Sequence, residues 1–126
     1  MDANELRIGN LIQWEDDSHD IVKITGIYIP INVKQYGYFV DYREILSKEN
    51  PKMNNGCAML SEFIPISLTE EWLIKLGMKR NLPIELEQDE YNNLFFMHKR
   101  GEIKVKYVHQ LQNIYFDING EELTYK

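Results

Sequence analysis

The chain has 126 residues, of which 44% are hydrophobic and 27% charged, and its formal net charge is −6. This length and composition fit one globular domain, with a possible subdivision into a β-rich part, 1–66, and a helix-hairpin-helix part, 67–126. No apolar run approaches the ~20 residues of a membrane helix, and the start, MDANELRIGN, lacks the apolar segment of a secretory signal.

The charge of the chain indicates the kind of partner it binds, and its cysteine content indicates the cellular compartment. Residues 1–66 carry 6 basic and 10 acidic side chains and residues 67–126 carry 8 and 10, so neither half is a polycation. Non-specific nucleic-acid binding requires Lys and Arg, whereas an acidic protein complements a basic partner surface. Cys57 is the only cysteine, which excludes an intrachain disulfide and favours a reducing, cytoplasmic compartment.

The amino-terminal part is predicted to form strands. LRIGNLIQW (6–14) and IVKITGIYI (21–29) are rich in β-forming residues and flank the polar turn EDDSHD (15–20), which indicates a hairpin. Gly26 marks a bulge or bend in the second strand, and YGYFVDY (36–42) is a third strand candidate. This arrangement resembles the opening of small SH3-like barrels.

A long loop and a short helix follow. ILSKENPKMNNGCAML (45–60) predicts the loop, and long loops in compact domains are often functional. SLTEEWLIKLGM (67–78) predicts the helix, because Thr69 suits the N-cap and Glu70 and Glu71 suit the positive end of the helix dipole. Gly77 is expected to end this helix.

A basic hairpin is predicted over YNNLFFMHKRGEIKVKYV (91–108), with KRGE as its turn. Apolar and basic residues alternate in its second strand, so one face is apolar and the other basic. Basic residues beside aromatic rings can bind single-stranded nucleic acid; the alternative is a plain exposed strand face. The candidate nucleic-acid residues are Lys99, Arg100, Lys104, Lys106 and Tyr107.

An acidic run precedes this hairpin at Glu85, Glu87, Asp89 and Glu90. Such a run could engage a basic groove on a partner protein. A solvated loop is the alternative.

The last helix is predicted over VHQLQNIYFDIN (108–119). At about 100° per residue, most apolar side chains from Val108 to Ile118 fall in one arc, and Asn119–Gly120 supplies the stop. The outer face is then a candidate protein-binding surface, with an aromatic anchor among hydrogen-bonding groups. The alternative is a solvated helix back or a contact with a neighbouring loop. Its residues are His109, Gln112, Asn113 and Phe116.

Catalytic and metal-binding signatures are missing from the sequence. No nucleophile motif is linked to His109, and HExxH, CxxC pairs, EF-hand loops, GxGxxG, GxxxxGK[ST] and GxSxG do not occur. His19 lies with Asp16, Asp17 and Asp20, which could ligate a metal chemically but are typical of a turn. We therefore expect no enzyme activity, cofactor or metal.

Three stretches, ANELRIGNLI, PISLTEEWLIKLGM and YVHQLQNIYFDINGEELTYK, resemble a family of short proteins from bacterial genomes, prophages and other mobile elements. Residues 30–60 and 79–92 carry no part of this pattern. The family has no assigned reaction, so the resemblance implies no catalytic residues. It implies a phage or mobile-element accessory protein, and small acidic proteins of that kind are often inhibitors of host defence, including anti-CRISPR proteins.

The sequence thus predicts an α+β fold: a mainly antiparallel sheet, partly an SH3-like barrel, with two short helices. The expected function is binding and inhibition of a host defence protein, such as a CRISPR nuclease, through the 109–116 helix face or the acidic run. The alternatives are a nucleic-acid-binding accessory protein that uses the hairpin 99–107, or a small phage structural component.

Overall fold

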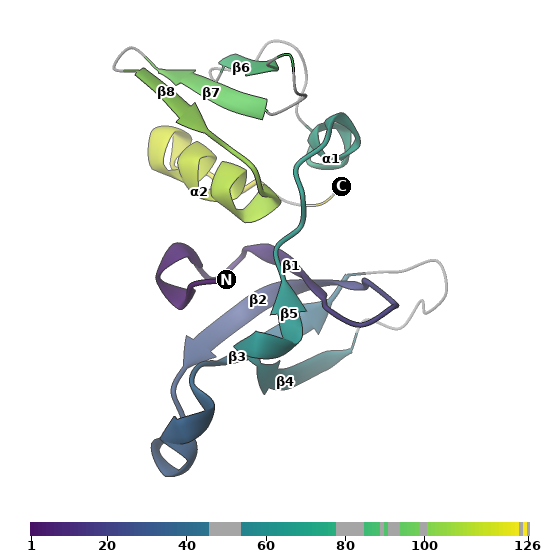
Figure 1. Cartoon of the computed structure of the whole chain (residues 1–126), viewed down its shortest axis with the longest axis vertical. Coiled ribbons are helices and arrows are strands. Elements are labelled where there is room, and N and C mark those ends of the chain that lie inside the picture. Colours follow the sequence, from purple (N-terminus) through teal and green to yellow (C-terminus); the bar gives the residue numbers. More distant parts are fainter. Residues whose placement is uncertain are drawn as a thin grey trace. The chain divides into compact units, whose positions relative to one another are not determined.

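The computed structural model describes residues 1–45, 54–77, 85–88, 90, 94–98, 101–123 and 125. The chain forms two compact units, Met1–Ile66 and Ser67–Lys126. Unit 1 holds a five-stranded sheet, and unit 2 holds a three-stranded sheet and two α-helices (Figure 1). All strand pairs are antiparallel, so the predicted α+β class is confirmed.

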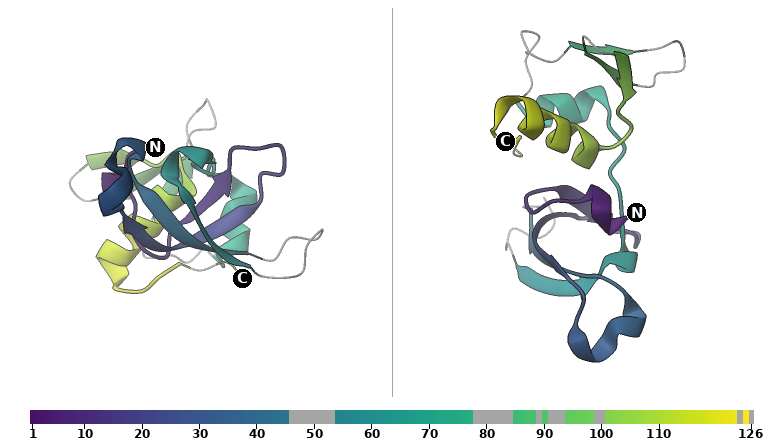
Figure 2. Two further views of the ribbon diagram at one scale, coloured as in Figure 1. Left: turned by 90° about the horizontal axis from the view of Figure 1, so that it is seen from below. Right: turned by 90° about the vertical axis from the view of Figure 1, so that its left-hand side faces the viewer.

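The sheet of unit 1 has the strand order β4-β3-β2-β1-β5. Its strands are β1 (Leu11–Trp14), β2 (Ile21–Tyr28), β3 (Phe39–Glu44), β4 (Asn55–Met59) and β5 (Phe63–Ile64). The sheet curls into a half-barrel (Figure 2), and a 3-10 helix, η3 (Leu60–Glu62), leads into β5. The strands β1 to β4 form a meander, and β1 also pairs with β5.

The concave core of unit 1 explains why these strands form. In β2 the buried Val22 and Ile24 alternate with the less buried Ile21 and Lys23, as expected when one face of a strand is covered. They pack with Ile12 and Val40, which are also fully buried. The register against β3 shifts between Ile24 and Gly26, so the predicted bulge at Gly26 is confirmed.

The predicted long loop at 45–60 is wrong over its second half. Asn55–Met59 forms β4 and pairs with β3 from Arg43↔Asn55 to Phe39↔Met59. Asparagine and glycine are poor strand formers, but pairing and the burial of Ala58 outweigh that local preference. Residues 46–53 lie outside the described part of the chain.

Two further 3-10 helices in unit 1 are absent from the sequence prediction. The helix η1 (Ala3–Glu5) begins after Asp2, whose Oδ1 accepts a hydrogen bond from the Asn4 amide at 3.0 Å. The helix η2 (Ile31–Tyr36) joins β2 to β3. Because Tyr36 belongs to η2, the third strand begins at Phe39 and not at the predicted position 36.

Unit 2 contains the predicted hairpin and both predicted helices. Its elements are α1 (Glu70–Lys75), β6 (Glu85–Gln88), β7 (Leu94–His98), β8 (Gly101–Lys104) and α2 (Val108–Asn119). The sheet order is β6-β7-β8. Thr69 caps α1 as predicted, because its Oγ1 accepts a hydrogen bond from the Trp72 amide at 3.3 Å.

The helix α2 ends at Gly120, as predicted. Its start is capped by a side chain that the sequence prediction had not identified. Gly120 follows it in the left-handed conformation with φ of 69°, which glycine adopts without a steric penalty. At the start, the Gln110 side chain reaches back, and its Oε1 accepts hydrogen bonds from the amides of Lys106 at 2.8 Å and Tyr107 at 3.2 Å. A glutamine at this position thus replaces the missing Ser, Thr, Asp or Asn cap.

Within the described ranges, no helix combines the length and the apolar character that crossing a lipid bilayer would require.

Candidate functional site

The outer face predicted for α2 does not exist as proposed. His109 is 1% exposed and Gln112 is 0% exposed, whereas both were expected to point to solvent. Asn113 is half-buried, and Phe116 is the one residue of the four that is exposed. The four residues therefore do not form one continuous solvent-facing surface.

Helix geometry and the carboxy-terminal segment explain this error. Gln112 lies four residues after Val108, and residues at this spacing are neighbours on a helix. The chain after Gly120 turns back, so that the Gln112 amide donates a hydrogen bond to the Leu123 carbonyl at 3.0 Å. His109 lies parallel to the Tyr107 ring, with ring centroids 5.7 Å apart and planes inclined by 8°. Polar side chains were wrongly assumed to be solvated.

The acidic run lies partly in a strand. Glu85 and Glu87 belong to β6 and pair with Met97 and Phe95 of β7, so this part is not the solvated loop that was the alternative. Glu90 is exposed. Asp89 lies outside the described residues.

The basic hairpin keeps few of its candidate residues within the described structure. Lys104 and Lys106 are exposed, whereas Lys99 and Arg100 fall outside the described residues. One face of the Tyr107 ring is covered by His109, so that face is not open for stacking against a base. The described part of the hairpin thus offers two exposed lysines beside a Tyr107 ring that has one face covered.

The DDSHD segment is a turn, as expected. The Asp16 Oδ1 accepts a hydrogen bond from the Ser18 amide at 3.0 Å, which is an Asx-turn, and His19 has a positive φ of 47°. Among the described residues, no group of three or more His, Cys, Asp or Glu side chains is arranged to hold a metal ion.

The most distinctive surface of the described chain lies around η2. Five large hydrophobic side chains are exposed between positions 28 and 38, and Ile31 is 84% exposed. These residues, which we call the η2 surface, are Tyr28, Ile29, Ile31, Tyr36 and Tyr38. Single exposed apolar residues are common on soluble proteins, whereas several of them within one short segment make that segment a candidate interaction surface.

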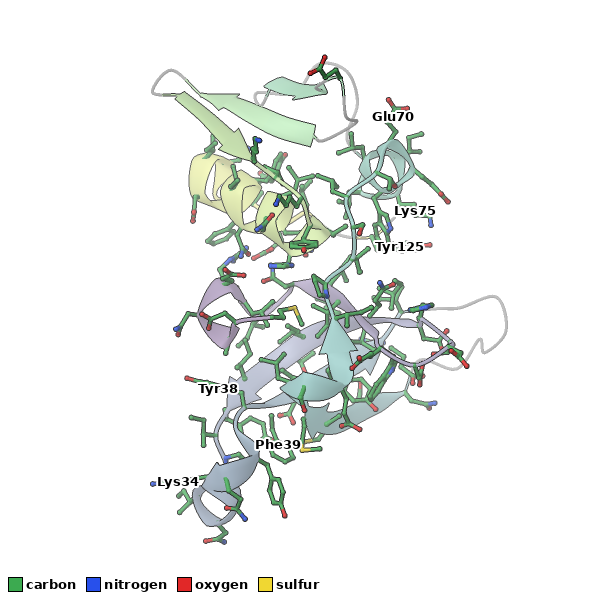
Figure 3. All side chains as sticks on the ribbon, in the orientation of Figure 1. Lys34, Tyr38, Phe39, Glu70, Lys75 and Tyr125 are labelled. Atoms are coloured by element: carbon green, nitrogen blue, oxygen red, sulfur yellow. The ribbon has the colours of Figure 1, made fainter. Side chains whose placement is uncertain are left out.

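The local sequence explains why these side chains face outward. Pro30 stands at the N-cap of η2 with φ of −64°, and proline favours the first turn of a helix. Gly37 ends η2 with a positive φ of 74°, which lets the chain reverse between Tyr36 and Tyr38. The helix η2 thereby projects beyond the sheet, and Lys34 lies at its outer end (Figure 3).

Tyr28 is held in place at one edge of the η2 surface. Its hydroxyl donates a hydrogen bond to Asp41 Oδ1 at 3.1 Å, and it lies 2.8 Å from Cys57 Sγ. Its ring stacks on Phe39, with centroids 6.4 Å apart. The hydrogen bond with Cys57, together with partial desolvation of the hydroxyl and the hydrogen bond to Asp41, raises the pKa of Tyr28 above the usual 10.0.

We expect this raised pKa to be measurable by NMR titration of the tyrosine rings. Tyr28 should stay neutral at a pH where an ordinary tyrosine, with a pKa of 10.0, is half ionised. Replacing Cys57 with alanine removes the largest cause, so the pKa of Tyr28 should fall toward 10.0. If Tyr28 titrated near 10.0 in the unaltered protein, the contacts with Cys57 and Asp41 would not persist in solution.

A hollow of about 430 Å³ adjoins the η2 surface. It is lined by Met1–Ala3, Tyr36–Tyr38, Leu60, Ser61 and Phe63. Leu60 and Phe63 are buried, whereas Tyr36 and Tyr38 are exposed, so the hollow has an apolar base and a rim with two tyrosine rings. Its volume falls within the range of roughly 300–1,000 Å³ that is typical of ligand pockets.

Sequence reasoning missed this site, although one signal was present. The segment IYIPINVKQYGYF carries more apolar and aromatic residues than a strand or a turn needs, and it is interrupted by Pro30 and Gly37. Excess apolar content between two predicted strands is the feature that could have indicated an exposed binding surface.

No protein-family model, curated protein or solved structure matches the chain.

Proposed function

We propose that the protein is a non-enzymatic binding module that docks on another protein through the η2 surface. The observation that carries this proposal is the cluster of exposed aromatic and aliphatic side chains at residues 28–38, beside a hollow of about 430 Å³. Tyrosine is enriched among the residues that dominate binding energy at protein interfaces. Tyrosine rings also supply contact area at a low cost in conformational entropy.

The sequence resemblance supports a host defence protein as the partner and the bacterial cytoplasm as the compartment. A phage or mobile-element protein can inhibit a defence nuclease, such as a CRISPR nuclease, by binding it tightly. Occupation of a functional groove, or stabilisation of one inactive conformation, would achieve this. The η2 surface of unit 1 is favoured over the face of α2 as the binding surface, because His109 and Gln112 are buried.

The test is affinity capture from an extract of the native host, with the tag at the carboxy end so that residues 1–3 are unaltered. A double variant, Ile31→Ser with Tyr36→Ser, should retain less than about a tenth of the partner, because loss of interface anchors typically weakens binding by more than tenfold. Both residues are highly exposed, so the fold should survive.

The matched control is Ile74→Ser, which removes an apolar side chain that is 75% exposed in unit 2. This variant should retain the partner as the unaltered protein does. Equal capture by the double variant would exclude the η2 surface as the docking site, and capture that depended on nucleic acid would favour the nucleic-acid alternative.

A further inference from the structure

We infer that the partner protein contributes an extended segment that adds a strand to the outer edge of β4, through the main-chain groups of Asn55 and Cys57. This inference rests on the proposed function, since it specifies how the chain of that partner binds beside the η2 surface. Three features of β4 carry it: the direction of its main-chain groups, its unprotected edge and its contact with Tyr28.

The hydrogen bonds at the two ends of β4 fix the direction in which its main-chain groups point. The Leu60 amide donates to the Tyr38 carbonyl at 2.9 Å, and the Glu44 amide donates to the Asn54 carbonyl at 2.8 Å. Such bonds occur at every second residue of an antiparallel pair. The odd-numbered residues of 55–59 therefore direct their N–H and C=O groups away from β3.

One of these outward groups is occupied, and those of two residues are open. The Met59 amide donates to a Glu62 carboxylate oxygen at 3.1 Å, which agrees with the direction inferred above. Asn55 and Cys57 are exposed. Within the described ranges β4 pairs with β3 alone (Figure 1), and no protein group bonds to the outward N–H or C=O of Asn55 or Cys57. Since each residue has one donor and one acceptor, both residues can pair fully with another chain.

The strand β4 lacks the features that usually protect an exposed sheet edge. Charged side chains, prolines and bulges on an edge strand discourage pairing with another chain. The sequence of β4, NGCAM, has neither a charged residue nor a proline, and its register against β3 runs without a bulge from Asn55 to Met59. The opposite edge of the sheet, β5, has only two residues, and a very short edge strand is itself a form of protection.

The pattern of open groups determines the occupant. Alternating donors and acceptors at strand spacing are matched by the main chain of an extended peptide, whereas the phosphate oxygens of a nucleic acid only accept. A second copy of the chain is disfavoured, because residues 1–66 carry 6 basic and 10 acidic side chains and two such units repel each other. We expect antiparallel pairing, which is slightly more stable than parallel pairing.

Tyr28 connects this edge to the η2 surface. Its hydroxyl lies 2.8 Å from Cys57 Sγ, and its ring stacks on Phe39, so the three side chains share the outer face of the sheet. A residue directly opposite Cys57 on an added strand would place its side chain on the same face. That side chain would lie beside Cys57 and the edge of the η2 surface, where an apolar residue is favoured.

The experiment is an NMR titration of the isotopically labelled full chain with acetyl-Lys-Thr-Val-Thr-Val-Thr-Lys-amide, whose β-branched residues favour an extended chain. Its twin is N-methylated on the three central amides, which removes donors from both edges of the peptide and keeps its side chains and charge. The first peptide should shift the amide signals of residues 55 and 57 and saturate them. The twin should bind at least about tenfold more weakly, because it cannot pair with β4.

Two matched pairs of variants locate the contact. Cys57→Pro removes an outward N–H without breaking a hydrogen bond to β3, and proline is tolerated at such positions of edge strands. It should weaken binding at least about fivefold, whereas Cys57→Ala loses the same thiol, keeps the N–H and should bind like the unaltered protein. Asn55→Pro and Asn55→Ala repeat the comparison at the second open residue, so the test holds even where one proline variant does not fold.

Equal affinity for the two peptides would overturn the inference, as would the lack of saturable shifts at residues 55 and 57. Self-association of the unaltered chain that Cys57→Pro abolished would also overturn it, because the occupant would then be a second copy. Failure here can be told apart from failure of the proposed function. If the peptides do not discriminate but the Ile31/Tyr36 double variant still loses the partner, the η2 surface stands and only the added strand is wrong.

Discussion

Replacing Ile24 with alanine should destabilise unit 1 by about 2–5 kcal/mol. Ile24 is fully buried on β2 and belongs to the core cluster of the curled sheet. Truncation of such a side chain costs about 2–5 kcal/mol, because the lost burial adds to the cavity left behind. A unit of this length is expected to have a total stability of only roughly 3–10 kcal/mol. The loss is thus a large part of the total.

The two tryptophans allow this loss to be assigned to unit 1. Trp14 lies in unit 1, 4.3 Å from the Phe63 ring centroid, and Trp72 lies in unit 2. In a Trp72→Phe background, fluorescence during denaturant unfolding therefore reports unit 1 alone. Ile24→Val, the conservative control, should cost about 0.5–1.5 kcal/mol. A change below about 1 kcal/mol for Ile24→Ala would mean that the core of the curled sheet is wrongly described.

Replacing Gln112 with alanine should destabilise unit 2 by about 1–3 kcal/mol. The Gln112 side chain is fully buried, and its amide donates to the Leu123 carbonyl. Without this donor, a carbonyl of the returning carboxy-terminal segment loses its partner, which costs its desolvation free energy. The ring of Tyr125 lies 6.0 Å from Trp72, so detachment of the segment should also alter the fluorescence of Trp72.

The readout for this variant is Trp72 fluorescence in a Trp14→Phe background. The control is Asp117→Ala, an exposed position on the same helix, which should stay within about 0.5 kcal/mol of the reference. If Gln112→Ala were equally harmless, the face of α2 would be solvated in the way that the sequence had suggested.

The elements with strong local signals were predictable from the sequence. Thr69 and Gly77 bracket α1, and Asn119–Gly120 ends α2, because capping is decided by a few neighbouring residues. The strands β2 and β3 carry enough β-forming residues to be recognised, and Gly26 marks the bulge. These features depend on local chemistry, so no knowledge of the tertiary fold was needed.

The elements that depend on distant partners were not predictable. Asn55–Met59 becomes β4 only because β3 offers it a pairing edge, and Phe63–Ile64 becomes β5 only by pairing with β1. The burial of Gln112 depends on Leu123, eleven residues later. A hydrophobic periodicity assigns polar residues to solvent, so it cannot detect a polar side chain that the chain itself covers later.

The candidate site was also missed from the sequence. There the error was that apolar residues are exposed, whereas in α2 polar residues are buried. Residues 21–29 and 36–42 were predicted as strands and the residues between them were not assigned, whereas the projection of η2 leaves five large apolar side chains between positions 28 and 38 exposed. The hollow joins residues 1–3, 36–38 and 60–63, and only the tertiary fold brings these three segments together.

Site-specific photocrosslinking in the native host tests the docking surface most directly. A benzophenone amino acid would be placed at Tyr36 on the η2 surface or, as the control, at Ile74 of α1, both of which are exposed. The proposed function predicts one protein crosslinked from position 36 and none from position 74. A crosslink that forms from position 74 but not from position 36, or crosslinks from position 36 to nucleic acid alone, would contradict it.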